Sequence, residues 1–113
     1  MTDCIFCSLA SGKIPTTVVY EDETVFAFND MDPQAPVHIL IIPKKHIESV
    51  AALNEENSAV VAHIFEVASK LAKDLKLDDG FRIVTNTGKS AGQSVKHLHF
   101  HLMAGRDFGW PAG

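Results

Sequence analysis

The segment with the clearest pattern reads Lys96-His97-Leu98-His99-Phe100-His101-Leu102-Met103. Histidine and apolar residues alternate in it, which is the two-residue period of a β-strand with unlike faces. We expect His97, His99 and His101 on one face and the apolar residues on the other. Because residues i and i+2 of a strand lie roughly 6.6 Å apart, the imidazoles would form a row on the order of 13 Å long. Such a row has room for a phosphate and its leaving group.

Two other interpretations of this row stay open on the residues alone. The row can be the solvent face of a half-buried strand, although three of the six histidines of the chain fall within these five residues. It can also be a His-x-His metal chelate, since neutral imidazole is the commonest nitrogen ligand in proteins.

The chain around this segment has the size and composition of one globular domain, which we expect to span residues 1–113. It is 46% hydrophobic and 21% charged, with a formal net charge of −4. Without a run rich in lysine and arginine, we expect no nucleic-acid polymer as a partner. Without 18 consecutive apolar residues, we expect no membrane span. Residues 1–4 carry no basic segment of a secretory signal, so we expect a cytoplasmic protein.

The remaining hydrophobic patterns predict an α+β fold: an antiparallel sheet of about five strands, one long helix and a short N-terminal helix. Short apolar and β-branched runs predict four further strands, at Val18–Tyr20, Thr24–Phe28, Val37–Ile42 and Phe81–Thr87. A short helical turn is expected within residues 3–13, ended by Gly12. Apolar residues at helical spacing predict the long helix from about Asn54, its N-cap, to Leu77, with Asp79–Gly80 at its exit.

The apolar stripe of this long helix is wider than one sheet face needs. We therefore expect a homodimer, joined through the exposed side of the 54–77 helix and the Phe81–Thr87 strand.

Several single residues allow both a structural and a functional interpretation. Cys4 and Cys7, reduced in the cytoplasm, form a metal half-site, a redox pair or two free buried thiols. Asp30 is either a turn residue or a binding group at a strand end. His38 fits an interior position, and His46 fits a solvated loop.

The His97–Leu102 segment resembles the His-φ-His-φ-His-φ signature of the histidine triad superfamily, in which φ is apolar. Three further motifs are similar to its Hint branch: Gly92-Gln93-Ser94-Val95, Asp30-Met31-Asp32-Pro33-Gln34-Ala35-Pro36-Val37-His38 and Ile42-Pro43-Lys44-Lys45-His46. The resemblance extends from Ile5 to Trp110. The Cys4-x-x-Cys7 pair departs from the animal-type pattern and resembles the zinc-bearing bacterial-type members.

The resemblance implies a nucleotide hydrolase or transferase, most simply a purine nucleoside phosphoramidase that releases a nucleoside monophosphate. His99 matches the family nucleophile, which forms a nucleotidyl-histidine intermediate. A covalent intermediate of this kind splits one difficult displacement into two easier ones. His101 matches a phosphate-binding position, Ser94 a hydroxyl near the leaving group, and His38 a supporting histidine. Trp110 matches a tail aromatic that influences the choice of leaving group.

The resemblance also assigns a set of nucleotide-binding positions. Asp30 matches the carboxylate that accepts the ribose hydroxyls. Six apolar residues match the base pocket: Ile5, Phe6, Ile14, Phe28, Met31 and Leu40. Four residues match the side of the phosphate and the leaving group: Asn86, Gly92, Gln93 and Val95.

We further expect a structural zinc ion bound by Cys4, Cys7, His46 and His97. Two thiolates at Cys-x-x-Cys spacing supply half of a tetrahedral site. His97 lies at the end of the histidine row, where it is not needed to bind the phosphate. His46 follows the Val37–Ile42 strand, which is expected to run beside the histidine strand. The zinc-bearing members of the family point to the same four residues.

Two alternatives to an enzyme remain on the sequence. One is a nucleotide-binding sensor with little turnover, and the other is a metalloprotein that uses the histidine row itself as a zinc chelate. The presence of both His99 and Ser94 favours the enzyme, because a protein that only binds needs no nucleophile.

Overall fold

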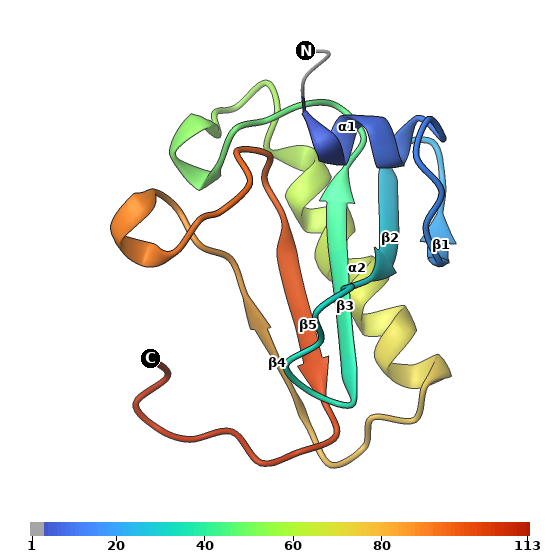
Figure 1. The fold of residues 1–113 in the computed structure, drawn as a ribbon, viewed down its shortest axis with the longest axis vertical. Coiled ribbons are helices and arrows are strands. Elements are labelled where there is room, and N and C mark those ends of the chain that lie inside the picture. The colour runs from blue at the N-terminus through green and yellow to red at the C-terminus, as the bar shows by residue number, and fades with distance from the viewer. Residues whose placement is uncertain (1–3) are drawn as a thin grey trace.

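The computed structural model describes residues 4–113, so residues 1–3, with the start of the expected N-terminal turn and the expected lack of a signal segment, lie outside the described part. The elements follow in the order α1 (Ile5–Ala10), β1 (Val18–Glu21), β2 (Val25–Asn29), β3 (Val37–Pro43), a 3-10 turn η1 (Val50–Ala52), α2 (Ala59–Asp74), β4 (Phe81–Val84), a 3-10 turn η2 (Lys89–Ala91) and β5 (Phe100–Ala104). The predicted α+β fold, with one long and one short helix, is confirmed (Figure 1).

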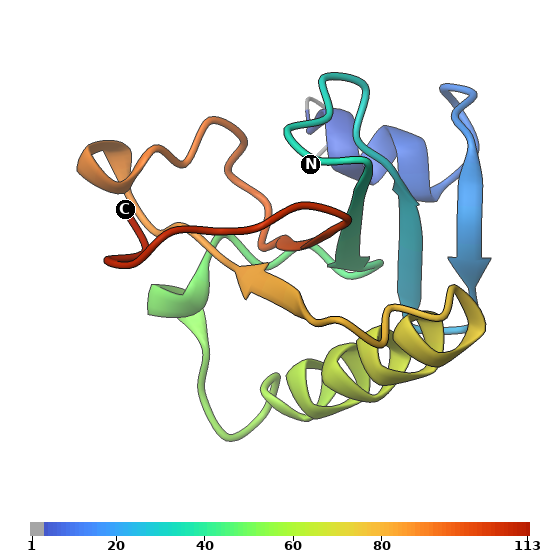
Figure 2. The same cartoon turned by 90° about the horizontal axis from the view of Figure 1, so that it is seen from below.

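The five strands form one antiparallel sheet in the order β1-β2-β3-β5-β4. Strand β3 lies at its centre and is buried along almost its whole length, as its nearly continuous apolar sequence predicts. The helices α1 and α2 lie on opposite sides of the sheet (Figure 2).

Side chains of β2 and β3 alternate between two apolar layers. Ile39 and Ile41 of β3 point to α2, where Ile64, Val67 and Leu71 complete the main core. Leu40 and Ile42 point to the other face, where they pack with Phe6 of α1 and with Phe26 and Phe28 of β2 in a smaller cluster. His38 shares this second face by the same alternation, and so does His101 of β5, which pairs with Leu40.

The histidine-rich segment is a strand over a shorter length than predicted. The ladder between β3 and β5 begins at Phe100, and residues 96–99 approach it as irregular chain. The carbonyls of His97 and His99 are bonded by side chains, namely the His99 ring and the Thr85 hydroxyl, so they do not extend the ladder. The expected division of faces holds, since Leu98, Phe100 and Leu102 all lie in the main core.

The long helix is also shorter than predicted at both ends. The Asn54 carboxamide oxygen accepts the N–H groups of Glu56 and Asn57, so Asn54 caps a separate turn and α2 starts at Ala59. At the other end, Leu77 N–H bonds Ala72 O and Lys76 N–H bonds Lys73 O, with Lys76 at φ 58°. This is the paired hydrogen-bond pattern that ends helices, and it stops α2 before the expected Asp79–Gly80 exit.

Strand β4 ends at Val84 instead of Thr87. In residues 4–113, no helix combines the length and the apolar character needed to cross a membrane.

Candidate active site

His99 is buried at the entrance to β5, and its ring has one defined protonated nitrogen. Its Nδ1 lies 2.6 Å from the carbonyl oxygen of His97. A carbonyl only accepts hydrogen bonds, so Nδ1 carries the proton and a neutral His99 has its lone pair on Nε2. The Thr85 hydroxyl donates to the carbonyl of His99 at 2.8 Å and restrains the backbone on the other side. In its neutral form, His99 therefore presents Nε2 as the ring nitrogen with the lone pair.

His101 is held by a chain of hydrogen bonds that starts in the β2–β3 loop. The backbone N–H of Gln34 donates to His38 Nδ1 at 3.0 Å. The proton of a neutral His38 is then on Nε2, which lies 2.9 Å from His101 Nδ1. His101 accepts at Nδ1, so its own proton is on Nε2. The centres of the His99 and His101 rings lie 5.1 Å apart, so the two imidazoles are close neighbours.

Burial lowers the pKa of His101 to about 4, and the neighbouring His99 and His38 add to the effect. His101 is therefore neutral near pH 7, and the hydrogen-bond chain determines which of its nitrogens donates.

Asp30 follows β2 at the edge of the histidine cluster. One carboxylate oxygen accepts the N–H of Asp32 at 2.8 Å, which is the turn contact that the sequence left as an alternative. The other oxygen lies 3.4 Å from His38 Nε2. Asp30 is thus a turn residue whose carboxylate still faces the histidines.

The residues expected around the base divide into a buried floor and an exposed rim. Phe6, Phe28 and Leu40 are buried in the smaller apolar cluster, and Val95 packs against it. The Phe6 ring stands perpendicular to the His99 ring, with centres 5.0 Å apart. The rim residues Ile5, Ile14 and Met31 are 50%, 40% and 94% exposed.

The loop before the histidines is held by the side chain of Gln93. Its carboxamide donates to the carbonyls of Glu48 and Val95 and accepts the N–H of Gly88. The amide of Gln93 therefore shapes the loop from within. Gly92, at φ 88°, closes the η2 turn in the left-handed conformation that glycine adopts without strain. Ser94 is exposed on this loop, and Asn86 is half-buried after β4.

The four residues expected to bind zinc form one cluster. Cys4, Cys7, His46 and His97 have donor atoms within 4.8 Å of one another. Nδ1 of His97 lies 3.3 Å from the sulfur of Cys4 and 3.5 Å from that of Cys7, whose sulfur lies 3.4 Å from His46 Nδ1. Ligands of a tetrahedral zinc with ordinary bond lengths have sulfur and nitrogen about 3.6 Å apart. The donor set and its spacing therefore fit a closed structural zinc site.

The surroundings of the cluster support the same conclusion. His97 Nε2 donates to the carbonyl of Pro43 at 2.8 Å, which directs the Nδ1 lone pair toward the cysteines. Burial lowers the pKa of His97 to about 4, so its ring is neutral. Burial also raises the pKa of the Cys7 thiol, a cost that a bound cation would reverse by stabilising the thiolate.

Asp30, His38 and His101 form a second group of close donor atoms. The N–H of Gln34 occupies His38 Nδ1, so the nitrogen of His38 that faces His101 carries the proton. The contact is a hydrogen bond, and this group is better described as a proton-ordering chain than as a ligand set.

Three contributors to the site were given no role by the sequence analysis. Gln34 acts through its backbone N–H, Pro43 through its carbonyl and Thr85 through a hydroxyl that bonds backbone. Gln34 and Pro43 lie within the quoted family motifs, but a backbone contact is not specific to a residue type.

Comparison with known proteins assigns the chain to a family. The family model of the HIT domain matches residues 11–108. A crystal structure of a HIT family hydrolase from Legionella pneumophila superposes with a TM-score of 0.94 at 48% sequence identity, covering 97% of this chain and 99% of that one. The chain belongs to the HIT family.

Two further relatives bear on the chemistry. A 14 kDa zinc-binding protein of Zea mays is 47% identical over 111 residues, which are 96% of this chain and 87% of that protein. A hypothetical histidine triad nucleotide-binding protein from Sulfolobus tokodaii is 38% identical with a TM-score of 0.80, covering 96% of this chain and 72% of that one. The maize relative and the Cys/His cluster together support the predicted structural zinc.

Proposed function

We propose that the protein hydrolyses purine nucleoside phosphoramidates, with His99 as the nucleophile. The observation that carries this proposal is the hydrogen bond from His99 Nδ1 to the His97 carbonyl, since it leaves Nε2 free to attack phosphorus. The coarser assignment to the HIT hydrolases and nucleotide-binding proteins is supported by the Legionella and Sulfolobus relatives.

The proposed reaction has two displacements. His99 Nε2 attacks phosphorus, the P–N bond breaks, and the leaving amine takes a proton that the Ser94 hydroxyl relays from solvent. Water then attacks the nucleotidyl-histidine, gives up a proton to solvent, and releases the nucleoside monophosphate together with free His99. His101 donates its Nε2 proton in a hydrogen bond to a phosphate oxygen in both steps, where negative charge develops.

The base and the ribose have separate proposed contacts. The purine lies between the buried floor of Phe6, Phe28 and Leu40 and the exposed rim of Ile5, Ile14 and Met31. Asp30 accepts the ribose hydroxyls. Asn86, Gly92, Gln93 and Val95 shape the side of the phosphate and leaving group.

The zinc ion has a structural part in this proposal. Four protein ligands leave no coordination position for water, so the metal would hold α1 against residues 96–99. Because His97 supplies both a ligand nitrogen and the carbonyl that orients His99, the metal site would steady the nucleophile.

We further propose a cytoplasmic homodimer. Reduced cysteines as metal ligands fit the cytoplasm. The exposed Phe65 of α2, Leu75 at the C-cap of α2 and Phe81 of β4 fit an apolar subunit interface.

Hydrolysis of adenosine 5′-phosphoramidate tests the proposed enzyme against a nucleotide sensor. We expect the wild type to release AMP over many turnovers, and His99→Ala to bind AMP with nearly unchanged affinity while losing several orders of magnitude in rate. Tight binding of AMP without turnover by the wild type would favour the sensor. Near-normal turnover by folded His99→Ala would remove His99 from the mechanism.

A further inference from the structure

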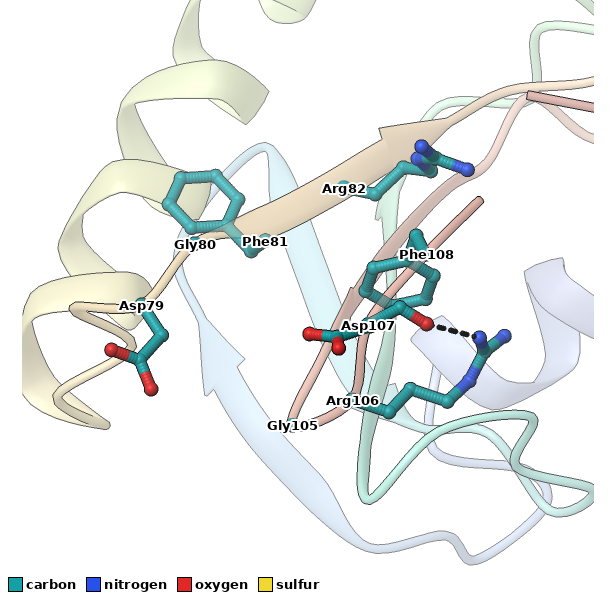
Figure 3. A pocket seen from close by; sticks show the side chains of 8 residues that line it. All are labelled: Asp79, Gly80, Phe81, Arg82, Gly105, Arg106, Asp107 and Phe108. Carbon is teal, nitrogen blue, oxygen red and sulfur yellow. Dashed lines mark hydrogen bonds between the residues drawn. The ribbon is translucent and has the colours of Figure 1, made fainter. Parts of the chain in front are cut away.

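Arg106, just after β5, is held in one position although it lies on the surface. Its Nε donates to the carbonyl of Gln34 at 2.9 Å, and its Nη1 donates to the carbonyl of Asp107 at 3.0 Å. The guanidinium carbon lies 4.3 Å from the centre of the Phe108 ring. Figure 3 shows Arg106 and Arg82 around that ring, at the wall of a surface pocket. Three contacts in different directions leave the Arg106 fork little freedom.

Arg106 binds Gln34, and Gln34 is the first residue in the series of hydrogen bonds that leads to His101. Gln34 offers its carbonyl to Arg106 and its N–H to His38 Nδ1, and His38 Nε2 bonds His101 Nδ1. Both backbone groups of Gln34 are therefore committed, one to the turn after β5 and one to the histidines. The carbonyl and the N–H belong to successive peptide units that meet at the Gln34 Cα, so a fixed carbonyl limits the backbone rotations by which the N–H could leave His38.

A second contact joins the same two segments. Gly105, at φ 96°, lies so close to Pro36 that an added Cβ would come within 2.8 Å of the proline Cβ. The turn after β5 is thus packed directly against the loop that carries Gln34, and Arg106 ties the two together from the side.

We propose that Arg106 is a positioning residue for the histidines: through Gln34 and His38 it holds His101 in the tautomer that donates from Nε2. A neutral histidine has two tautomers of similar energy, and only one of them places a donor toward the phosphate. When the Gln34 N–H leaves His38, the Asp30 carboxylate at 3.4 Å still favours a proton on His38 Nε2, but Nδ1 is no longer held as an acceptor and His101 loses its fixed acceptor role. This inference rests on the proposed function for its kinetic consequence, but not for its structural one.

Arg82 provides a matched control. Its guanidinium also lies over Phe108, at 5.2 Å from the ring centre, and it bonds the carbonyl of Gly109. It makes its contacts with the tail, whereas Arg106 reaches the β2–β3 loop. Arg82→Ala and Arg106→Ala therefore both remove a cation from Phe108, and Arg106→Ala also removes the bond to Gln34.

The test is imidazole ¹⁵N NMR on histidine-labelled protein, combined with kinetics on adenosine 5′-phosphoramidate. In the wild type and in Arg82→Ala we expect His38 and His101 each with an unprotonated Nδ1 and a protonated Nε2. In Arg106→Ala we expect both residues to show averaged tautomers, the Gln34 amide to shift, and kcat to fall about tenfold with little change in KM. Arg106→Met keeps an apolar stem over Phe108 but has no hydrogen-bond donor, so we expect the same NMR and kinetic changes as in Arg106→Ala. If Arg106→Ala does not fold, Arg106→Met serves as the test variant.

Wild-type tautomer signals in the folded Arg106 variants would overturn the proposal. So would equal changes in Arg82→Ala, since these would indicate a general loosening of the tail. The NMR comparison needs no turnover, so a wild type that releases no AMP would refute the proposed function and leave this test intact.

Discussion

At the scale of single residues, the histidines of the site differ in which ring nitrogen carries the proton. Backbone groups decide this for three of them: the carbonyl of Pro43 for His97, the carbonyl of His97 for His99 and the N–H of Gln34 for His38. The His38 ring decides it for His101. A row of chemically equal side chains thereby acquires separate roles. His97 presents a lone pair to the cysteines, His99 presents one to the proposed phosphorus, and His101 presents an N–H.

Asp30→Asn separates the turn role of Asp30 from its proposed ribose role. The carboxamide oxygen can still accept the N–H of Asp32, so the turn should persist, but the charge is lost. Hydrogen bonds to a charged group contribute about 1.5–3 kcal/mol each. We expect calorimetry to show AMP binding weakened at least about tenfold and binding of 2′,3′-dideoxy-AMP little changed. Equal losses for both ligands would restrict Asp30 to the turn.

At the scale of elements, the sequence predicts most strands because the two-residue and 3.6-residue periods report burial directly. The boundaries fail where contacts from elsewhere in the chain intervene. Residues 96–99 have the alternation of a strand, yet side chains bond their carbonyls and the ladder starts at Phe100. Asn54 has the chemistry of a helix cap, and it caps a preceding turn.

The same contrast separates the parts of the candidate site. The metal cluster could be predicted because its ligands belong to side-chain types with characteristic spacing. The series of hydrogen bonds from Arg106 through Gln34 and His38 to His101 could not be predicted, because two of these bonds use backbone atoms that any residue carries.

Cys4→Ser tests the attachment of α1 through the metal. We expect the wild type, purified without chelator, to contain about one zinc ion per chain and Cys4→Ser to contain almost none. The mutant should also unfold at lower temperature, because α1 loses its tie to residues 96–99. As a control, His101→Ala should keep its zinc. Loss of zinc from His101→Ala would instead support a chelate formed by the histidine row, and little zinc in the wild type would remove the site.

His63→Ala tests the link between the β1–β2 turn and α2. His63 Nε2 lies 2.6 Å from an oxygen of Asp22, and this hydrogen bond, with a second one to Glu66, raises the pKa of His63. Burial opposes the shift at Asp22, but bonds from His63, Tyr20 and two backbone N–H groups lower its pKa overall.

The signs of these shifts define a pH window. A raised histidine pKa stabilises the fold below the unfolded value of about 6.5 and loses that effect as pH rises through the folded value. An aspartate whose pKa is lowered by folding stabilises the fold above its unfolded pKa of about 4. That stabilisation is lost as the pH falls through the lower folded pKa. Urea unfolding should therefore show His63→Ala most destabilising near pH 5 and less so at pH 9. Lys70→Ala, which removes an exposed pair with Asp74 on the same helix, should show little such difference. A loss for His63→Ala that is independent of pH would contradict the ion pair.

At the scale of the whole molecule, the two faces of the sheet carry different parts of the structure. One carries α2 and the main core, and the other carries α1, the metal cluster and the histidines. Strand β4 is an edge of the described sheet, with Phe81 42% exposed; Phe65 of α2 and Leu75 at its C-cap are each 45% exposed. Exposed apolar side chains are thus present on both α2 and the β4 edge of the sheet.

We expect light scattering at micromolar concentration to give the mass of a dimer. Phe81→Asp should give a monomer, because a charge at this edge would be buried in the expected interface. Val18→Asp places the same charge on the opposite edge, where Val18 is 49% exposed, and should remain a dimer. A monomeric wild type would refute the dimer without affecting the chemistry proposed for one chain.

The claim that His99 forms a covalent bond to the nucleotide is tested most directly by mass spectrometry of the protein quenched during turnover of adenosine 5′-phosphoramidate. The account predicts a fraction of chains heavier by one adenylyl group, with the group mapped to His99 by fragmentation and absent from His99→Ala. Rapid turnover with no such adduct at any quench time, or an adduct on another residue, would contradict it.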